Sequence, residues 1–295
     1  MSSRLPESIA SGTSTSNPKR TSPTTLDDEA LMMFEENLRA QLPGISEIVG
    51  RAEARKRRKK AAVTTLGMLV IGALLWADPV YHTENIATRI GERSVWEMHD
   101  GSQIALNTDS SLRIAHHLRS RQVYLERGEA LFTVSHSRLR SFVVHAYHTR
   151  VVDIGTVFNV RNTENGADVT VVEGSVQVFP ESTTQNGPIL RAGETIRVDQ
   201  AGLQAIHATD TELATGWRHG KLYFDRTPLR QLAAELNRYR HHPVMVASAI
   251  GDVRISGQFD IDNLEQLLTM LPTLAPVRIE HRTDGSVAIS SRTDK

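Results

Sequence analysis

The most distinctive hydrophobic pattern is an apolar run from Ala61 to Ala77 (AAVTTLGMLVIGALLWA), which contains no charged residue. A helix needs about 17 apolar residues to cross a hydrocarbon core of about 30 Å, so the run predicts a transmembrane helix over residues 61–77. A buried core helix fits less well, because a basic block flanks one end of the run only. A cleaved signal peptide is disfavoured because about 60 residues precede the run.

After this run the pattern becomes that of β-structure. Short segments of alternating apolar and polar residues are separated by turn residues about every ten positions. This pattern predicts an all-β domain over residues 85–208, arranged as a sandwich, a jelly roll or a solenoid-like stack. The predicted strands include Ser94–Met98, Gln103–Leu106, Gln122–Glu126, Ala130–Val134, Ser141–His145, Val151–Ile154, Val157–Arg161, Asp168–Val172 and Ser175–Phe179.

Residues 216–295 combine the apolar spacing of helices with the alternation of strands, and they predict a compact α+β domain with the order β-α-β-β-α-β-β. Thr227 is the expected N-cap of the first helix, with Pro228 at its first position, and Asp260 or Asp262 is the expected cap of the second. Residues 211–217 are expected to be a linker. The predicted strands are Lys221–Asp225, Pro243–Ala247, Val253–Gly257, Val277–Glu280 and Ser286–Ser290.

The region before the apolar run has two parts. Residues 1–25 are rich in Ser, Thr and Pro and are predicted to be disordered. Residues 26–60 predict two short amphipathic helices separated at Pro43-Gly44. Because two such helices cannot enclose a core, we expect them to fold against a partner, although a passive juxtamembrane tail is the alternative. The apolar residues expected to contact the partner are Leu31, Phe34, Leu38, Ile45, Ile48 and Val49.

Charge is balanced over the whole chain, with 34 Lys and Arg against 34 Asp and Glu, but it is not balanced locally. A basic block from Arg51 to Lys60 precedes the apolar run, and no comparable block follows it. Since cationic residues stay on the cytoplasmic side, the N-terminus is expected to be cytoplasmic and the later domains external. The balanced net charge gives no indication of direct nucleic-acid binding. The absence of cysteine excludes disulfides, thiolate metal sites and cysteine nucleophiles.

Several segments together resemble the FecR family of membrane-bound regulators of extracytoplasmic-function sigma factors. The resemblance extends over about two-thirds of the chain, and its segments keep the family's order. The C-terminal part is similar to a fold shared by secretins and the signalling domains of TonB-dependent receptors. The segments that carry the resemblance are GERSVWEMHDGSQIALNTDSSLRI (91–114), VYLERGEALFTV (123–134), SFVVHA (141–146), VVDIGTVFNV (151–160), VTVVEGSVQV (169–178), GWRHGKLYFDRTPLRQLAAELNRY (216–239) and RISGQFDIDNLEQLL (254–268).

The resemblance implies a relay across three compartments. A TonB-dependent outer-membrane receptor, often for an iron chelate or haem, would touch the C-terminal domain from the periplasm, and the inner segment would then change its hold on a cytoplasmic sigma factor. The implied location is the inner membrane, with a single crossing, a cytoplasmic N-terminus and a periplasmic C-terminus. Family members usually have a longer, Trp-containing inner domain, whereas this chain has no Trp before Trp76.

The receptor contact is expected to extend a sheet of the C-terminal domain by one strand, with specificity supplied by aromatic and Arg side chains. The candidates are Tyr239, Arg240, Arg254 and Phe259. The alternative for Tyr239 and Phe259 is that they complete the core of their own domain. No cofactor is expected.

The sequence contains little that suggests catalysis. The adjacent pairs His116-His117 and His241-His242, and His145 with His148, are not spaced to place two side chains on one face of a strand, so no metal site is expected. The resemblance to the FecR family also implies a possible reaction. Some members of that family cleave themselves at a Gly-Thr pair, which here corresponds to Gly155 and Thr156. The chain is otherwise not expected to be an enzyme; the alternative for this pair is a glycine bulge beside a packed Thr.

Two other classes of function compete with a sigma-factor regulator. A periplasmic scaffold would use its secretin-like domain to dock an envelope or export assembly, and would tolerate loss of the inner helices. An enzyme or metal-binding module would need a convergent polar pocket, which the sequence does not indicate. The sequence names neither the sigma factor nor the receptor nor its ligand.

Overall fold

The computed structural model describes residues 25–41, 45–137, 140–153, 155–180 and 187–292. The chain divides into two compact units, residues 1–71 and 72–295. The tail predicted to be disordered, residues 1–25, lies outside the described residues except for Thr25.

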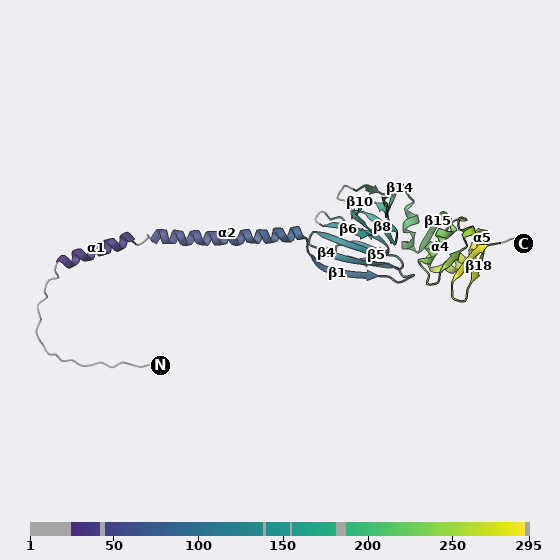
Figure 1. Cartoon of the computed structure of the whole chain (residues 1–295), viewed down its shortest axis with the longest axis horizontal. Helices are drawn as coiled ribbons and strands as arrows, with labels where there is room; N and C mark the ends of the chain where they lie inside the picture. The colour runs from purple at the N-terminus through teal and green to yellow at the C-terminus, as the bar shows by residue number, and fades with distance from the viewer. Residues whose placement is uncertain (1–24, 42–44, 138–139, 154, 181–186, 293–295) are drawn as a thin grey trace, which may run out of the picture. The chain divides into compact units, whose positions relative to one another are not determined.

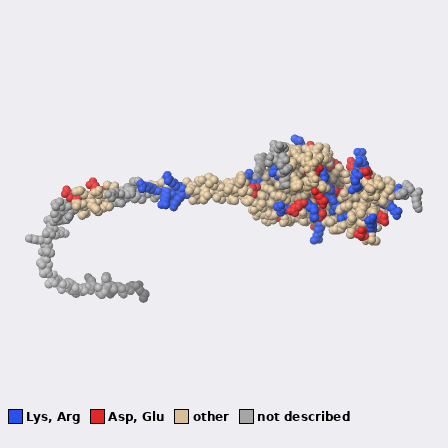
Figure 2. All heavy atoms as spheres, viewed as in Figure 1, with Lys and Arg blue, Asp and Glu red and all other residues tan. Residues whose placement is uncertain are grey.

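Two helices, α1 (Thr25–Gln41) and α2 (Ile45–Ala77), precede the strands. α2 is continuous over 33 residues, so the second amphipathic segment, the basic block and the apolar run are parts of one helix (Figure 1). Its segment Val49–Ala77 is long and apolar enough to cross a membrane. The hydroxyls of Thr64 and Thr65 donate to carbonyls one turn earlier, at 2.9 Å each, which satisfies both groups within the helix. Figure 2 shows the cationic side chains concentrated on the first half of α2.

The β-domain is a two-layered sandwich whose layers are joined by one long strand, β5 (Ser120–Thr133). Residues 120–127 of β5 pair in the first sheet and residues 128–133 pair in the second. The first sheet has the order β1 (Val80–Ala87), β4 (Ser111–His117), β5, β6 (Ser141–Ala146), β7 (Thr149–Asp153), β10 (Ser175–Pro180) and β11 (Ile189–Arg191). The second has the order β2 (Ser94–Glu97), β3 (Gln103–Leu106), β5, β8 (Val157–Thr163), β9 (Gly166–Glu173) and β12 (Glu194–Asp199), with β13 (Gly202–Leu203) and β14 (His207–Ala208) paired to β12.

The two sheets enclose a single hydrophobic core to which both contribute alternate residues. Phe132 is at its centre, with its ring centroid 5.1 Å from that of Phe158 and 5.9 Å from that of Phe142. The all-β prediction is confirmed, and the sandwich is the one of the three predicted architectures that the structure adopts. The first strand starts at Val80, earlier than the predicted limit of residue 85.

One predicted turn is wrong. The predicted strands Gln122–Glu126 and Ala130–Val134 are parts of one strand, because β5 passes through Gly128 without interruption. Gly128 has φ +86°, and a Cβ there would overlap the backbone of Ser110. Glycine therefore permits the strand to bend from one sheet into the other, rather than ending it.

The C-terminal domain contains two small sheets covered by helices. β15 (Lys221–Pro228) pairs with β17 (Arg254–Asp260), and the second sheet has the order β16 (Val244–Val246), β19 (Val287–Ser291), β18 (Val277–His281). The helical elements of this region are α3 (Thr211–Thr215), η1 (Gly216–His219), α4 (Leu229–Asn237), η2 (Ser248–Ile250), η3 (Ile261–Asn263) and α5 (Leu264–Leu274).

Three local predictions in this domain need correction. The N-cap of α4 is Pro228 and not Thr227. Asp260 caps the short helix η3 by accepting from the Asp262 N–H at 3.1 Å, and α5 follows directly from η3. Residues 211–217 are helical rather than a linker, and Trp217 is buried.

The C-terminal domain packs against the outer face of the second sheet of the β-domain. Ala105 and Leu131 belong to the same buried cluster as Trp217 and the apolar side chains of α4, and Val157 and Val172 pack against that cluster. The two regions predicted as separate domains therefore share a hydrophobic core. Because of this contact, polar side chains on the outer face of the second sheet lie next to the C-terminal domain.

Candidate functional site

A row of alternating charges crosses the outer face of the second sheet. Glu129 of β5 is opposite Arg161 of β8, Arg161 is opposite Asp168 of β9, and Asp168 is opposite Arg197 of β12. The neighbouring residues in these strands point into the sandwich core, so these four side chains point outward. Each charge thus has an opposite charge on the adjacent strand, an arrangement that stabilises cross-strand pairs.

Glu235 of α4 and Arg238, which follows the helix as its C-cap, complete an ion cluster with the first two members of this row. Arg238 donates from Nη2 to Glu129 Oε2 and from Nη1 to Glu235 Oε1, both at 2.6 Å. Arg161 Nη1 donates to Glu235 Oε2 at 2.8 Å. We call Glu129, Arg161, Glu235 and Arg238 the interdomain ion cluster. It joins the sheet of the β-domain to the C-terminal domain.

Within the ion cluster Glu129 is buried, Glu235 and Arg238 are largely buried, and Arg161 is partly exposed. The Glu129 side chain is 4% exposed, and both of its oxygens also accept from amides, Asn107 and Asn159, at 2.8 Å each. Burial opposes ionisation of Glu235, but the adjacent Arg238 and Arg161 outweigh this effect and lower its pKa. Burial likewise opposes the charge on Arg238, whereas Glu129 and Glu235 raise its pKa. Glu235 and Arg238 are therefore expected to be charged at neutral pH.

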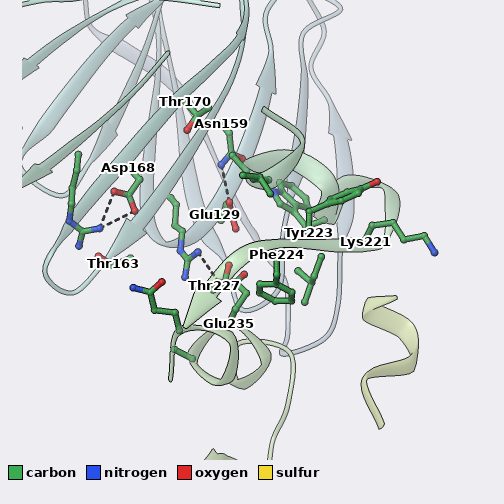
Figure 3. Close-up of a pocket in the computed structure, with 18 of the residues that line it drawn as sticks. Glu129, Asn159, Thr163, Asp168, Thr170, Lys221, Tyr223, Phe224, Thr227 and Glu235 are labelled. Atoms are coloured by element: carbon green, nitrogen blue, oxygen red, sulfur yellow. Dashed lines mark hydrogen bonds and ion pairs between the residues drawn. The ribbon is translucent and has the colours of Figure 1, made fainter. Parts of the chain in front are cut away.

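Next to the ion cluster is a cavity of about 610 Å³, which we call the interdomain cavity. Figure 3 shows Asn159, Asp168 and Thr170 on the sheet side and Tyr223 and Phe224 along β15. Burial raises the pKa of Asp168, although Arg197 and Arg161 oppose that shift. The lining residues are Glu129, Asn159, Arg161, Thr163, Asn165, Asp168, Thr170, Arg197, Leu213, Ala214, Trp217, Lys221, Leu222, Tyr223, Phe224, Thr227, Gln231, Ala234 and Glu235.

The Gly155–Thr156 pair lies between β7 and β8, and a single carboxylate contacts both residues. The Thr156 hydroxyl donates to Asp153 Oδ1, and the Gly155 N–H donates to Asp153 Oδ2 at 2.9 Å. Gly155 has φ +96°, and a Cβ at this position would lie 2.7 Å from His136 Nδ1. Burial raises the pKa of Asp153, although the bonds from Thr156 and Gly155 oppose that shift. Thr156 is only 3% exposed, and its hydroxyl is held by the hydrogen bond to Asp153.

Two family models match separate parts of the chain. The model described as FecR protein matches residues 84–177, and that described as FecR, C-terminal matches residues 221–289, so that together they match more than half of the sequence. The chain belongs to the FecR family. The matched segments include Glu129, Arg161, Glu235 and Arg238, so the whole ion cluster lies within them, whereas Arg197 of the charged row lies outside both.

Two solved structures share the fold of this FecR-family chain. Both are crystal structures of a protein from Parabacteroides distasonis described as a putative anti-sigma factor, at 2.50 Å and 1.65 Å resolution. Each is 24% identical in sequence and has a TM-score of 0.62. The matches cover 72% and 71% of this chain and 100% of the other. No curated protein matches the sequence.

The structure places the predicted receptor-binding residues in different environments. Tyr239 is only 7% exposed, and its hydroxyl accepts from Asn107 of the β-domain at 2.8 Å. Its assignment to a receptor surface is therefore wrong, because it packs between the two domains. Phe259 is half-buried against the core, with its ring 5.9 Å from Phe224. Arg240 is largely buried in an ion pair with Glu265, whereas Arg254 is exposed on β17 and donates to the Arg226 carbonyl at 2.9 Å.

The predicted sigma-binding residues that the structure describes are all exposed. Leu31, Phe34, Leu38 and Val49 lie on α1 and α2 with 45–67% of their surface accessible. The side chains of Ile45 and Ile48 lie outside the described part of the structure. Met32 and Met33 are equally exposed on α1, and the sequence analysis did not include them.

The histidines do not assemble a metal site in the part of the chain that the structure describes, where no group of three or more His, Cys, Asp or Glu is arranged to hold a metal ion. His116 Nε2 is hydrogen-bonded to Glu84 Oε1 at 3.1 Å. His117 Nδ1 is hydrogen-bonded to the backbone carbonyl of Asp78 at 2.6 Å. The His145 ring stacks on Tyr124 at 4.5 Å. These contacts give the three histidines structural roles within the first sheet and at its end near α2.

Sequence reasoning missed two groups of functional candidates. Asp153 could have been found, because its position three residues before Thr156 puts a carboxylate within reach of the hydroxyl in a tight connection. The members of the ion cluster are widely separated in sequence. Only the strand register and the docking of α4 bring Glu129, Arg161, Glu235 and Arg238 together.

Proposed function

We propose that this FecR-family chain is an anti-sigma factor that spans the inner membrane once and relays a signal from a TonB-dependent outer-membrane receptor to a cytoplasmic extracytoplasmic-function sigma factor. Membership of the FecR family is the observation that carries this proposal. The structural relative described as a putative anti-sigma factor supports it, as does the segment of α2 that is apolar enough to span a bilayer. The controlled genes would serve uptake, with an iron chelate or haem as the expected signal.

The basic block of α2 supports an orientation with the N-terminus in the cytoplasm. Reporter fusions placed after Lys60 and after Thr83 are expected to be active in opposite compartments: the first in the cytoplasm, the second in the periplasm. Activity of both fusions in the same compartment would contradict the single crossing.

The exposed apolar side chains of α1 support a contact with the sigma factor. An amphipathic helix binds by placing its apolar face in a groove of the partner, and Leu31, Phe34 and Leu38 are spaced to share one face. The double substitution Phe34→Asp/Leu38→Asp puts two charges on this face and is expected to release the sigma factor. RNA sequencing should then show altered transcription of one sigma-dependent group of genes.

The matched control is Asn37→Asp/Ala40→Asp, which adds the same charge at the border of that face and on the opposite side of the helix. It is expected to leave transcription unchanged at an equal level of protein in the membrane. The same pair of variants separates this function from the periplasmic scaffold, because a scaffold would be indifferent to both. Equal transcription in wild type and the Phe34/Leu38 variant would show that the sigma contact lies elsewhere.

On the periplasmic side, the proposed receptor contact uses a sheet edge of the C-terminal domain. β16 and β18 are the outer strands of the three-stranded sheet, and β15 and β17 each have one paired neighbour, so these edges offer backbone groups to an added strand. Arg254 is the exposed candidate beside such an edge. Arg254→Glu is expected to weaken binding of the receptor's signalling domain about tenfold or more, measured by titration calorimetry. Arg282→Glu, at the exposed β18–β19 turn, is the control, and equal weakening by both would contradict a specific role for Arg254.

A second candidate activity, self-cleavage between Gly155 and Thr156, is supported by the hydrogen bond from the Thr156 hydroxyl to Asp153. The hydroxyl donates to a half-buried carboxylate that can take its proton, and it is adjacent in the chain to the Gly155 carbonyl. Cleavage would leave the two fragments joined, because β7 and β8 both pair with strands on the other side of the break: β7 with β10 and β8 with β5. We propose that this reaction modifies the regulator without separating its domains.

A further inference from the structure

The β-domain is joined to the end of α2 by hydrogen bonds and not by a linker. The last turn of α2 and the β-domain belong to the same compact unit, residues 72–295. The Asp78 carboxylate, directly after the helix, accepts from the Arg119 N–H at 2.7 Å and from the Ser120 hydroxyl at 2.8 Å. Arg119 also donates from Nη1 to the Leu75 carbonyl at 3.1 Å. The β4–β5 turn is therefore held against the last turn of the apolar run.

The exposed side chains around this turn are of the kinds found at a membrane surface. Trp76 on the last turn of α2 is 88% exposed, Tyr81 of β1 is 57% exposed, and Leu118 of the β4–β5 turn is 41% exposed. Trp and Tyr are enriched where hydrocarbon meets lipid headgroups, because each combines an apolar ring with a polar group. We call Trp76, Tyr81, Leu118, Arg119 and Arg140 the juxtamembrane patch.

The two arginines give the juxtamembrane patch a positive charge. Arg140, directly before β6, donates from Nε to the Leu118 carbonyl at 3.2 Å and from Nη2 to the Tyr81 hydroxyl at 3.5 Å. Unlike the arginines of the interdomain ion cluster, neither Arg119 nor Arg140 forms an ion pair with a carboxylate among the residues that the structure describes. Because a guanidinium binds phosphate oxygens through paired N–H groups, these two side chains suit the phosphate layer of a bilayer.

We propose that the juxtamembrane patch rests on the surface of the bilayer that α2 crosses. Its apolar side chains lie at the depth of the headgroups, and Arg119 and Arg140 bind lipid phosphates. The inference rests on the single crossing proposed above. A protein partner is the alternative occupant, but the bonds to Asp78 and Leu75 hold the turn where the apolar run ends, which is the level of the headgroups. Lipid then holds the β-domain in addition to α2, so that lipid composition acts on the outer part of the regulator.

The experiment uses a fluorescent label on a single introduced cysteine, because the chain has no cysteine of its own. The full chain is reconstituted in vesicles of phosphatidylcholine and phosphatidylglycerol that also contain lipid with a nitroxide quencher on its headgroup. The label on Leu118→Cys is expected to be strongly quenched. The control is Glu164→Cys in the exposed β8–β9 turn, beyond the pairing of β8 with Gly128 and about 25 Å from the patch along β5. Its label is expected to keep its full fluorescence.

Charge variants made in the Leu118→Cys chain test the contact with phosphate. Arg119→Gln/Arg140→Gln is expected to shift the ratio of docked to free patch by about 25-fold, because each arginine near an anionic membrane surface contributes a factor of about five. Quenching should fall accordingly. Arg113→Gln/Arg127→Gln removes the same charge from the first sheet away from the patch, and it is expected to leave quenching unchanged.

A third label separates this inference from the proposed crossing. Gly67→Cys lies in the apolar run, where an added Cβ meets no other atom within 4 Å, and lipid with the nitroxide on its acyl chain should quench its label. Quenching at residue 67, with the Leu118 label no more quenched than the Glu164 label, overturns the docking and leaves the crossing intact. No quenching at residue 67 overturns both.

Equal quenching in the two arginine double variants overturns the binding of lipid phosphate by Arg119 and Arg140. Thermal unfolding checks that each variant is folded. If Leu118→Cys is not folded, a label on Tyr81→Cys reports on the same patch and is expected to give the same result.

Discussion

Thr156→Ala is expected to abolish cleavage of the Gly155–Thr156 peptide bond completely. In the proposed reaction the Thr156 hydroxyl gives its proton to Asp153, and its oxygen attacks the Gly155 carbonyl carbon. The C–N bond then breaks as the nitrogen takes up a proton, which leaves an ester and a free Thr156 amine. Water hydrolyses the ester to a Gly155 carboxylate and restores the hydroxyl. Alanine removes the nucleophile and therefore leaves no route to the ester.

The measurement is the mass and N-terminal sequence of fragments from membranes that contain the full chain. Wild type should give a fragment that begins at Thr156, Thr156→Ser should retain cleavage, and Asp153→Asn should slow it by about 10²- to 10⁴-fold, the usual contribution of a general base. Fragments that begin at Thr156 in the Ala variant would show that a separate protease cuts the chain. If Asp153→Asn cleaves normally while Thr156→Ala does not cleave, Thr156 is the nucleophile but Asp153 is not the base.

The reaction should also depend on pH in a defined direction. Asp153 accepts a proton only as a carboxylate, and burial raises its pKa above the ordinary value of 3.8. The cleavage rate should therefore rise with pH through that raised pKa and level off above it. A rate that falls as the pH increases over the same range would contradict the role of this carboxylate.

Arg238→Met is expected to lower the free energy of unfolding of the part of the chain after α2 by about 3–5 kcal/mol, the usual cost of removing one partner from a buried ion pair. The substitution leaves Glu129 and Glu235 buried without the cation that bonds both of them at 2.6 Å. Urea unfolding of wild type and variant measures the difference. The double substitution Arg238→Met/Glu129→Gln restores neutrality and should recover part of the loss. Glu235 is then the one carboxylate left in the ion cluster, and Arg161 still pairs with it.

The matched control is Arg230→Met in α4, the helix that Arg238 caps; this substitution breaks an exposed ion pair with Asp252. Exposed pairs contribute about 0–1 kcal/mol, so this variant should remain close to wild type. Glu235 has a lowered pKa in the folded state, and it therefore contributes stability above its unfolded value near 4.5 that is lost as the pH falls through the lowered pKa. Equal stability of Arg238→Met and Arg230→Met would show that the interdomain ion cluster does not hold the domains together.

The secondary structure could be predicted from the sequence wherever a single local pattern was sufficient to identify the element. Alternating residues identified β8 and β9, because Phe158 and Val160 of β8 and Val169 and Val171 of β9 face the sandwich core. Gly128 was misread as a turn because the same left-handed backbone serves both a turn and a strand bend, and only the close approach of Ser110 distinguishes them. Pro228 was placed one position too far into α4, since proline is suited both to the first turn of a helix and to the position before it.

The candidate sites were less predictable because they depend on tertiary contacts. Tyr239 was assigned to an outer surface, but the docking of α4 on the β-domain buries it beside Asn107. Arg197 and Trp217 line one cavity only because the C-terminal domain covers the second sheet. Gly155 and Thr156 could be singled out in sequence, whereas the role of Asp153 required the geometry of the β7–β8 connection.

Co-purification of a sigma factor with the full chain from solubilised membranes tests the central claim most directly. Mass spectrometry would compare the proteins bound to wild type, to Phe34→Asp/Leu38→Asp and to the control Asn37→Asp/Ala40→Asp at equal amounts of bait. The proposed function predicts one extracytoplasmic-function sigma factor bound to wild type and to the control and lost from the Phe34/Leu38 variant. A wild-type sample without any sigma factor, or one that keeps the same sigma factor in all three samples, would contradict it.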